Sequence, residues 1–248
     1  MPRFFIDDPG IRCDDPVGAA LCITGDDARH VSLSLRMRVG DPLTVCDGTG
    51  TDYFCRITSI VPGTVELEVQ SFSKSVTEPP VLITLYQCYL KGDQADDLIR
   101  GCVELGVGRI VMVRSQNAVS RPDASSEQKK LVRWNRIARE AAMQCGRGAI
   151  PTVEESVDFS EAAQRLSRDE LGFACCETER ELSLKTLLDR PRPKSCSFLV
   201  GPEGGLAQSE LETLDLFGVP RVTLGTRILR ARTAPLAALS ALLFRWEL

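Results

Sequence analysis

Residues 198–214 read FLVGPEGGLAQSELETL, and residues 222–243 read VTLGTRILRARTAPLAALSALL. In each stretch a short apolar run stops at a glycine, Gly201 in the first and Gly225 in the second. Two such strand ends, side by side in an open α/β sheet, would present backbone N–H groups to a ligand in the crevice beyond the strands. The glycines of GPEGG carry no Cβ that would hinder a close approach. The pair therefore predicts a ligand site, although a Gly-Pro cluster alone indicates only a turn.

Each of these stretches also predicts a helix. In the first, Ser209 stands at the expected N-cap and Glu212 at the capping-box position. In the second, residues 234–244 (APLAALSALLF) are almost wholly apolar. A helix of that composition is expected to be buried, either against its own sheet or against a second subunit.

From residue 81 onward, apolar runs typical of strands alternate with segments typical of helices. The nearly continuous apolar run at 81–86 is typical of a strand buried on both faces of a parallel sheet. Further strands are predicted at 109–113, 172–176, 198–200 and 222–224, and helices at 94–105 and 126–145. The alternation predicts an α/β domain over residues 73–248, which begins with a proline-bearing seam at 73–80.

The first 72 residues follow a different pattern. Runs at 43–46, 53–57 and 65–69 alternate or nearly alternate, with turn pairs Asp47-Gly48 and Pro62-Gly63 between them. This spacing predicts a small β-barrel over residues 1–72. A short helix is expected at 26–38, because that segment opens on acidic and closes on basic residues.

Composition excludes several classes of protein. The chain has 248 residues and is 43% hydrophobic, enough for a real core, and we expect it to be soluble and cytoplasmic because no leader pattern or membrane-length apolar run occurs. The ten scattered cysteines are expected to be buried thiols rather than a disulfide framework. His30 is the only histidine, which argues against a metal site and against Ser-His or Cys-His catalysis. No phosphate-loop or dinucleotide fingerprint is present.

Positive charge is concentrated although the net charge is −4. Residues 112–150 hold eight basic side chains against three acidic ones. A polyanion would therefore be drawn to particular faces of the molecule rather than to its whole surface.

Read together, the motifs resemble the RsmE family of ribosomal RNA methyltransferases, a branch of the SPOUT superfamily. The resemblance covers the whole chain and rests on the joint spacing of several short motifs. These are PRFF at 2–5, His30 with LRMR at 35–38 and Gly40-Asp41, Asp47-Gly48, Lys91 and Asp93 with ELGV at 104–107, QCGR at 144–147, GPEGG at 201–205 with Glu210, and LGTRILR at 224–230.

The resemblance implies a PUA-like β-barrel at residues 1–72, which assists RNA binding, and a SPOUT methyltransferase domain with a trefoil knot at 73–248. It implies S-adenosyl-L-methionine as the methyl donor and N3 of a uridine in 16S ribosomal RNA of the small subunit as the acceptor. Family members act as homodimers, so the apolar last helix is a candidate interface. Neither a metal nor a membrane is expected as a partner.

Site residues follow from the same resemblance. Arg230 and Arg232 would be catalytic, since a cation near the uracil oxygens stabilises the charge that develops when N3 loses its proton. The cofactor-binding residues would be Cys175, Cys176, Glu177, Leu199, Val200, Gly201, Pro202, Glu203, Gly205, Leu224, Gly225, Ile228, Leu229, Arg230 and Ala234. The RNA-binding residues would be Arg3, His30, Arg36, Arg38, Arg114, Arg121 and Arg147.

Several of these residues, and the function itself, allow a second interpretation. Glu203 could be a structural acceptor of backbone N–H groups, and Arg227 and Arg230 could fix the knot by binding carbonyl groups. Many relatives read RTETA where this chain has RARTA at 230–234, so a glutamate is replaced by Arg232. The competing functions are a SPOUT methyltransferase for another RNA position and a catalytically weakened RNA-binding assembly factor.

Overall fold

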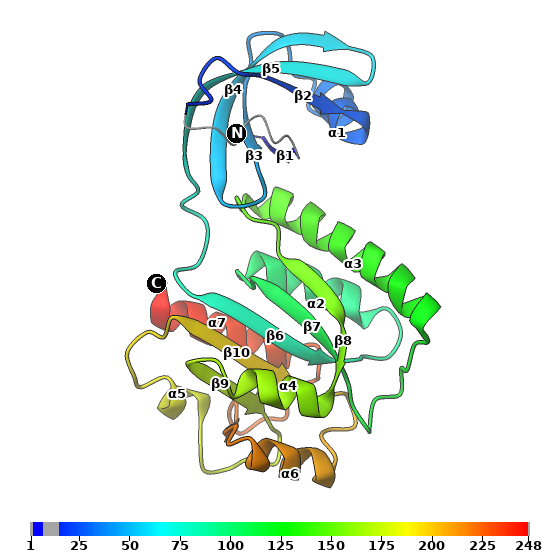
Figure 1. Cartoon of the computed structure of the whole chain (residues 1–248), viewed down its shortest axis with the longest axis vertical. Coiled ribbons are helices and arrows are strands. Elements are labelled where there is room, and N and C mark those ends of the chain that lie inside the picture. The colour runs from blue at the N-terminus through cyan, green and yellow to red at the C-terminus, as the bar shows by residue number, and fades with distance from the viewer. Residues whose placement is uncertain (1, 7–14, 248) are drawn as a thin grey trace. The chain divides into compact units, whose positions relative to one another are not determined.

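A computed structural model describes residues 2–6 and 15–247. Cys13, one of the ten cysteines, lies outside the described residues. Clustering of contacts divides the chain into two compact units (Figure 1). The first comprises Met1–Glu78 and Ala142–Ile150, and the second comprises Pro79–Ala141 and Pro151–Leu248.

The first unit is built on a five-stranded mixed sheet with the order β1-β3-β4-β5-β2. Its strands are β1 (Arg3–Phe5), β2 (Ala20–Thr24), β3 (Pro42–Cys46), β4 (Thr51–Val61) and β5 (Thr64–Lys74). Only the β1–β3 pair is parallel, and the other pairs are antiparallel. Alternating apolar residues such as Val65, Leu67 and Val69 face a core that is almost fully buried.

The helix expected at residues 26–38 is shorter than the charge pattern predicted. It consists of α1 (Gly25–Arg29) followed by one π-helical turn, η2 (His30–Ser34). The Leu35 N–H donates to the His30 carbonyl at 2.9 Å and caps this turn. Arg36 then adopts a left-handed backbone conformation, with φ of 53°, which ends the helix four residues early.

The second unit contains a six-stranded, wholly parallel sheet with the order β11-β9-β10-β6-β7-β8. Its strands are β6 (Leu82–Cys88), β7 (Arg109–Arg114), β8 (Thr152–Asp158), β9 (Leu171–Cys175), β10 (Ser195–Val200) and β11 (Arg221–Val222). Its helices are α2 (Gln94–Glu104), α4 (Phe159–Leu166), α5 (Leu184–Leu187), α6 (Gln208–Leu216) and α7 (Ala234–Trp246). The longest helix, α3 (Ala124–Cys145), starts in the second unit and ends in the first. This confirms the predicted α/β class.

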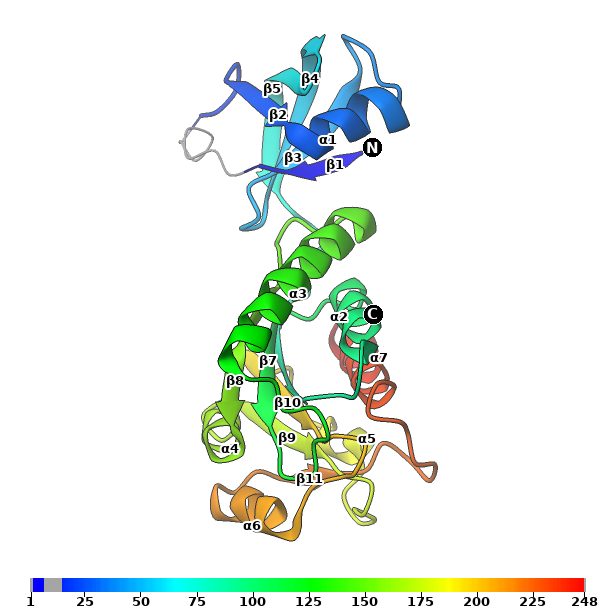
Figure 2. The same cartoon turned by 90° about the vertical axis from the view of Figure 1, so that its right-hand side faces the viewer.

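Helices cover both faces of the parallel sheet, as Figure 2 shows for α2 and α7 on one side and α4 on the other. Phe159, Ala163 and Leu166 of α4 pack on one face together with Leu214 of α6. On the other face α7 lies against α2, and Gly101 of α2 approaches the Leu236 side chain so closely that an added Cβ would stand 2.9 Å from it. The predicted burial of the last helix is confirmed for this side, whereas Phe244 on its outer side is 76% exposed.

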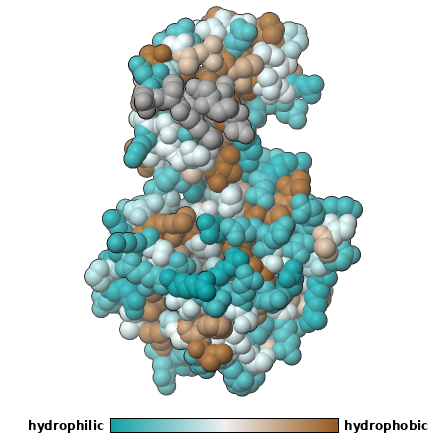
Figure 3. Space-filling model, in the orientation of Figure 1, coloured by the Kyte–Doolittle hydropathy of each residue, from teal (hydrophilic) through white to brown (hydrophobic). Residues whose placement is uncertain are grey.

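On the face drawn in Figure 3, hydrophobic residues of the second unit form small separate patches among hydrophilic ones. Among residues 2–6 and 15–247, no helix has both the length and the apolar character needed to cross a membrane. Cys22 and Cys145 are exposed, and the other described cysteines are buried.

Candidate functional site

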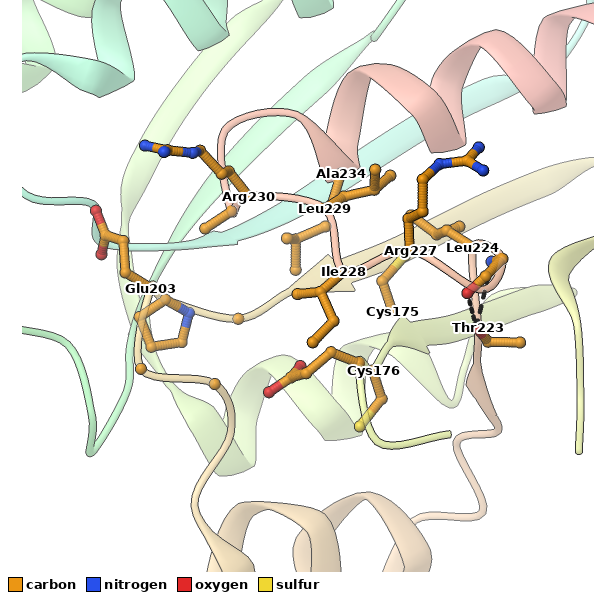
Figure 4. Close-up of a pocket in the computed structure, with 18 of the residues that line it drawn as sticks. Cys175, Cys176, Glu203, Thr223, Leu224, Arg227, Ile228, Leu229, Arg230 and Ala234 are labelled. Carbon is orange, nitrogen blue, oxygen red and sulfur yellow. Dashed lines mark hydrogen bonds between the residues drawn. The ribbon is translucent and has the colours of Figure 1, made fainter. Parts of the chain in front are cut away.

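A cavity of about 490 Å³ opens at the carboxyl ends of β9, β10 and β11 (Figure 4). Three loops form it: residues 175–177 after β9, residues 201–205 after β10, and residues 223–231 after β11. The strand–glycine units at Gly201 and Gly225 thus meet at one edge of the sheet, as their sequence predicted. This is the crevice in which open parallel sheets bind ligands.

The loop at 201–205 depends on glycine at one position. Gly205 has φ of +69°, and its N–H donates to the Pro202 carbonyl at 3.0 Å, which closes a tight turn. A Cβ at Gly205 would lie 2.2 Å from Oε1 of Glu177. Glycine adopts this backbone conformation without strain, and any larger residue would also have to push the Glu177 carboxylate aside.

Two contacts attach the same loop to neighbouring parts of the sheet edge. The Glu203 carboxylate accepts the backbone N–H of Lys91 at 2.9 Å. The Asn117 side-chain amide donates to the carbonyls of Gly204 at 3.4 Å and Gly205 at 3.2 Å. Glu203 is therefore an acceptor of a backbone N–H, as one interpretation of the sequence held, but the donor belongs to the segment after β6.

The helix after the loop begins differently from the prediction. α6 starts at Gln208, with Ala207 at the N-cap, so the assignment of Ser209 and Glu212 to the capping positions was wrong. Glu210 instead reaches back and accepts the Ala207 N–H at 2.8 Å. Its carboxylate also accepts the Gln116 N–H at 2.9 Å and the Ser115 hydroxyl at 3.2 Å. Glu210 is only 5% exposed, and these distant donors are what favours this register of the helix start.

The third loop carries two of the three arginines that line the cavity, and the other is Arg180, in the segment after β9. Arg227 and Arg230 of the third loop are exposed, and Figure 4 shows the side chains of Arg230 and Glu203 on one side of the cavity and those of Arg227 and Thr223 on the other. The loop is stiffened at its start, where the Gly225 N–H donates to the Thr223 hydroxyl at 3.2 Å. At its end, the Arg230 carbonyl accepts the N–H groups of Thr233 and Ala234. The Arg230 backbone is thus fixed at the start of α7 while its guanidinium extends outward.

The thiol of Cys175, which lines the cavity, is a weak nucleophile. Burial raises the pKa of Cys175, so at neutral pH it remains a thiol rather than a nucleophilic thiolate. A reactive methyl group in the cavity would therefore meet no strong sulfur nucleophile at this position.

Most of the predicted cofactor-binding residues line this one cavity. Leu199 does not, because it is fully buried in the core on the α4 side of the sheet. The predicted residues that line the cavity are Cys175, Cys176, Glu177, Val200, Gly201, Pro202, Glu203, Gly205, Leu224, Gly225, Ile228, Leu229, Arg230 and Ala234. Arg232 is exposed on the same loop but is not part of the lining.

The residues predicted to bind RNA fall into distinct environments. Arg3 forms a two-pronged ion pair with Asp52, with both N–O distances 2.9 Å, and Arg147 pairs with Glu78 at 2.6 Å. The side chain of Arg147 is only 6% exposed, so it holds the first unit together. His30, Arg36 and Arg38 are exposed on the first unit, and Arg114 and Arg121 on the second.

Several lining residues were absent from the sequence prediction: Gln94, Arg180, Gly204, Thr223, Thr226, Arg227 and Ala231. Gly204, Thr226, Arg227 and Ala231 lie between predicted residues of their loops, so the loop boundaries alone could have included them. Thr223 directly precedes the first predicted residue of its loop. Asn117 lies behind the cavity and had only one available signal, its position directly after a predicted strand of the same sheet.

Comparison with known proteins agrees with this geometry. Residues 77–243 match the RNA methyltransferase domain family, and residues 23–70 match the RNA methyltransferase PUA domain. The ribosomal RNA small subunit methyltransferase E of Bacillus subtilis is 31% identical over all of this chain and 98% of its own length.

Two solved structures are similar over nearly the whole chain. The ribosomal RNA small subunit methyltransferase E of Neisseria gonorrhoeae, bound to S-adenosyl methionine, has a TM-score of 0.87 and 32% identity, covering 99% of this chain and 98% of its own. A methyltransferase of Legionella pneumophila, also with its cofactor bound, has a TM-score of 0.84 and 26% identity, with 98% and 96% covered.

Proposed function

This chain belongs to the family of ribosomal RNA small subunit methyltransferases E, and from that premise we propose that it methylates N3 of one uridine in 16S ribosomal RNA. S-adenosyl-L-methionine is the methyl donor. The observation that carries the proposal is the convergence of three loops, one of them glycine-rich and one cationic, on one cavity at the carboxyl edge of the parallel sheet. We infer a location in the cytoplasm from the ribosomal substrate.

The residues present fit the methyl donor. A cavity of about 490 Å³ is within the usual size of small-molecule sites, ~300–1,000 Å³. Val200, Leu224 and Leu229 would supply apolar surface for the adenine, and the close-packed turn at Gly205 would leave backbone groups accessible to the polar parts of the molecule. When bound, the sulfonium supplies an already activated methyl group, so the protein needs chiefly to position the acceptor nitrogen for an in-line attack.

We assign electrostatic assistance to Arg230. Uracil N3 is a weak acid, and negative charge develops on the neighbouring oxygens O2 and O4 as its proton leaves. A guanidinium at the cavity would lower the energy of that state, and the backbone of Arg230, held at the start of α7, aids this role. Arg232 lies on the same loop outside the cavity lining, so we expect a smaller contribution from it.

RNA contacts are assigned to the exposed cations. On the first unit these are Arg36 and Arg38, beside the exposed His30. Arg3 and Arg147 are left out of this set, because their guanidinium groups are already held by Asp52 and Glu78.

We further propose that the protein acts as a homodimer through the outer side of α7. Phe244 is 76% exposed there, and an adjoining cavity of about 860 Å³ is lined by Ala237 and Ala241 as well as by Thr223–Gly225 of the third loop. A partner seated on α7 would therefore touch the methyl-donor loop itself. Phe244→Asp should give a monomer by light scattering, whereas Leu216→Asp, an equally exposed apolar residue on α6, should leave the dimer intact.

We also propose that the first sheet closes into a PUA-like β-barrel. We propose in addition that the second unit contains a trefoil knot. Thr223 is held at the start of α5, since its N–H donates to the Leu182 carbonyl and its carbonyl accepts the Leu184 N–H. A chain that passes on from there to α7 is positioned to thread the loop before α5. Stretching the unfolded protein from both ends tests the knot, because a knotted chain extends to less than its full contour length.

Mass spectrometry of 16S ribosomal RNA tests the function. A strain that lacks this protein should lose one N3-methyluridine, and adding the purified protein with S-adenosyl-L-methionine should restore it. Persistence of the modified base in the deletion strain would contradict the proposal. Methylation at another RNA position would support the alternative of a relative with a changed target, and no calorimetric binding of the cofactor would support the nonenzymatic alternative.

A further inference from the structure

A second cavity, of about 350 Å³, lies at the carboxyl ends of β6 and β7, on the same edge of the sheet as the methyl-donor cavity. Its walls come from Tyr89, directly after β6, and from the loop that follows β7 between residues 114 and 122. Its size suits one small aromatic ring system with its substituents.

The two arginines of this cavity differ in whether a carboxylate pairs with them. Arg114 is paired with Glu127 at 3.3 Å and with Asp158 at 3.4 Å. Arg121 instead donates to the carbonyls of Gln116 at 2.5 Å and Ala118 at 3.3 Å. Of the carboxylates in the described part of the chain, none forms an ion pair with Arg121. The Arg121 guanidinium is thus held in place by neutral groups and keeps its full charge for an anion.

Part of the cavity is nonpolar. Tyr89 and Ala118, which are almost fully covered at 2% and 5% exposed, form its floor, and the half-buried Pro122 adds nonpolar surface that a ligand can reach. The Tyr89 ring is supported from behind, with its centroid 6.2 Å from that of Trp134 and with Lys130 Nζ 5.9 Å from both rings. A rigid nonpolar wall beside a fixed cation is what an unstacked nucleotide requires, since the base needs a nonpolar surface and the phosphate a positive charge.

The loop that forms this cavity also supports the methyl-donor loop. Asn117 donates to the carbonyls of Gly204 and Gly205, and Glu210 binds both Gln116 and the start of α6. The loop that lines the second cavity is therefore hydrogen-bonded to the loop that lines the first. Adjacent nucleotides of a single strand could occupy both cavities.

We propose that this cavity binds one unstacked nucleotide of the RNA substrate, a neighbour of the uridine to be methylated, with its phosphate at Arg121. The inference rests on the proposed function and adds a second base-binding subsite to it. Arg121 acts as a binding residue here, and the fixed loop at 115–117 sets the distance between the two nucleotides.

Salt dependence of RNA binding tests this subsite. The full-length variants Arg121→Ala and Arg121→Lys are compared with Arg168→Ala, an exposed arginine in the turn before β9, at the opposite edge of the sheet. Binding of a 16S ribosomal RNA fragment is measured by fluorescence anisotropy between low and moderate salt, together with methylation rates and calorimetric binding of S-adenosyl-L-methionine.

Loss of one phosphate contact should raise the RNA Kd and KM of Arg121→Ala by about fivefold to tenfold and lower the slope of log K against log salt by roughly 0.7–1. The methyl-donor affinity should be unchanged, Arg121→Lys should keep the wild-type slope, and Arg168→Ala should match wild type. An unchanged slope and KM in Arg121→Ala would overturn the inference. So would an Arg121→Ala protein that loses its dimer but keeps the slope, because the cavity would then be a protein contact.

Photocrosslinking gives an independent measurement that does not depend on how the variants fold. Wild-type protein is irradiated with an RNA fragment that carries 4-thiouridine beside the target position. Crosslinks should map to Tyr89 or to residues 114–122, and crosslinks confined to other segments would contradict the proposal. If wild-type protein methylates the RNA but the Arg121 and crosslinking results are negative, the subsite alone fails. If it methylates no RNA, the proposed function fails.

Discussion

The carboxylate of Glu210 accepts the backbone N–H of Gln116 at 2.9 Å, although 94 positions of sequence separate the two residues. The same carboxylate accepts the N–H of Ala207 at 2.8 Å, directly after the GPEGG loop. One nearly buried charge therefore fixes both the loop after β7 and the start of α6. The loop at 201–205, which lines the cavity at the carboxyl ends of β9, β10 and β11, is thereby tied to the loop after β7.

Removal of that carboxylate should loosen the cavity. Glu210→Ala leaves donors of Gln116 and Ala207 without an acceptor, so we expect a loss of roughly 3 kcal/mol in the free energy of unfolding by urea. We also expect the calorimetric affinity for S-adenosyl-L-methionine to fall at least ~tenfold. A tenfold loss of affinity corresponds to about 1.4 kcal/mol, which is less than the expected loss of stability. Glu212→Ala, in the same helix and exposed, should change both by little. Equal effects of the two substitutions would contradict this role of Glu210.

Gly205 offers a test with a matched control. Gly205→Ala and Gly218→Ala both place a side chain at positive φ, +69° and +66°, which costs each about 1 kcal/mol. Only at Gly205 would the new Cβ also collide with Glu177, whereas nothing lies within 4 Å at Gly218. The exposed Glu177 carboxylate can move aside, so similar stability losses are expected in urea. Because Glu177 lines the cavity, its displacement should lower the methyl-donor affinity of Gly205→Ala alone. A normal affinity of Gly205→Ala would show that the loop can yield.

Arg230→Ala should lower kcat for RNA methylation at least tenfold, which corresponds to about 1.4 kcal/mol of transition-state stabilisation, without lowering thermal stability. The side chain is exposed and its backbone contacts do not require the guanidinium. Arg232→Ala serves as the comparison and should have the smaller effect. Rates measured under single-turnover conditions with saturating cofactor decide between them. Unchanged turnover would remove Arg230 from the site.

Arg147 should behave as a structural residue. Glu78 accepts the Arg147 guanidinium and also the N–H groups of Gly148 at 3.0 Å and Ala149 at 3.1 Å. Breaking a buried pair of this kind typically costs about 3–5 kcal/mol, so Arg147→Ala should be strongly destabilised in urea. Arg38→Ala, on the exposed surface of the same unit, should instead weaken RNA binding and leave stability unchanged. If Arg147→Ala weakened RNA binding and left stability unchanged, Arg147 would be an RNA contact after all.

The stability of the protein should respond to acid through Glu127. Burial acts to raise its pKa, but bonds from Ser156 and Arg114 outweigh burial and hold the pKa below 4.5. A carboxyl group with a lowered pKa contributes stability that is present above its unfolded pKa and is lost as the pH falls through the folded pKa. Glu127→Gln should therefore cost about 1 kcal/mol at neutral pH. The difference from wild type should shrink below pH 4.5, and Glu155→Gln, an exposed neighbour on β8, should show no such trend.

The parallel sheet and its cavity loops were predictable because their signals are local. Apolar runs such as 81–86 and the glycine breaks at 201 and 225 each mark a strand or its end without reference to the rest of the chain. β8 was missed for the opposite reason. It lies at the edge of the sheet, its TVEESVD sequence is half polar, and only alternate parts of it are buried.

Partnerships between distant residues could not be predicted. Arg3 and Arg147 carry the charge that RNA contacts need, but nothing nearby in the sequence identifies Asp52 and Glu78 as their partners. The capping position in α6 was misplaced likewise, because Glu210 is selected by donors in the loop at 115–116. In both cases the decisive energy comes from contacts that exist only after the chain has folded.

The assignment of Ala142–Ile150 to the first unit affects how the protein can fold during its own synthesis. Glu78 and Gly48 are synthesised early, but their partners come later in the chain. The Glu78 carboxylate pairs with Arg147, and the Gly48 carbonyl accepts the Ile150 N–H. A ribosome must therefore translate Pro79–Ala141, the first part of the second unit, before the amino-terminal unit can close. The usual order, in which the first domain is finished before the second begins, does not apply here. Nor can either unit be excised as one uninterrupted stretch of gene.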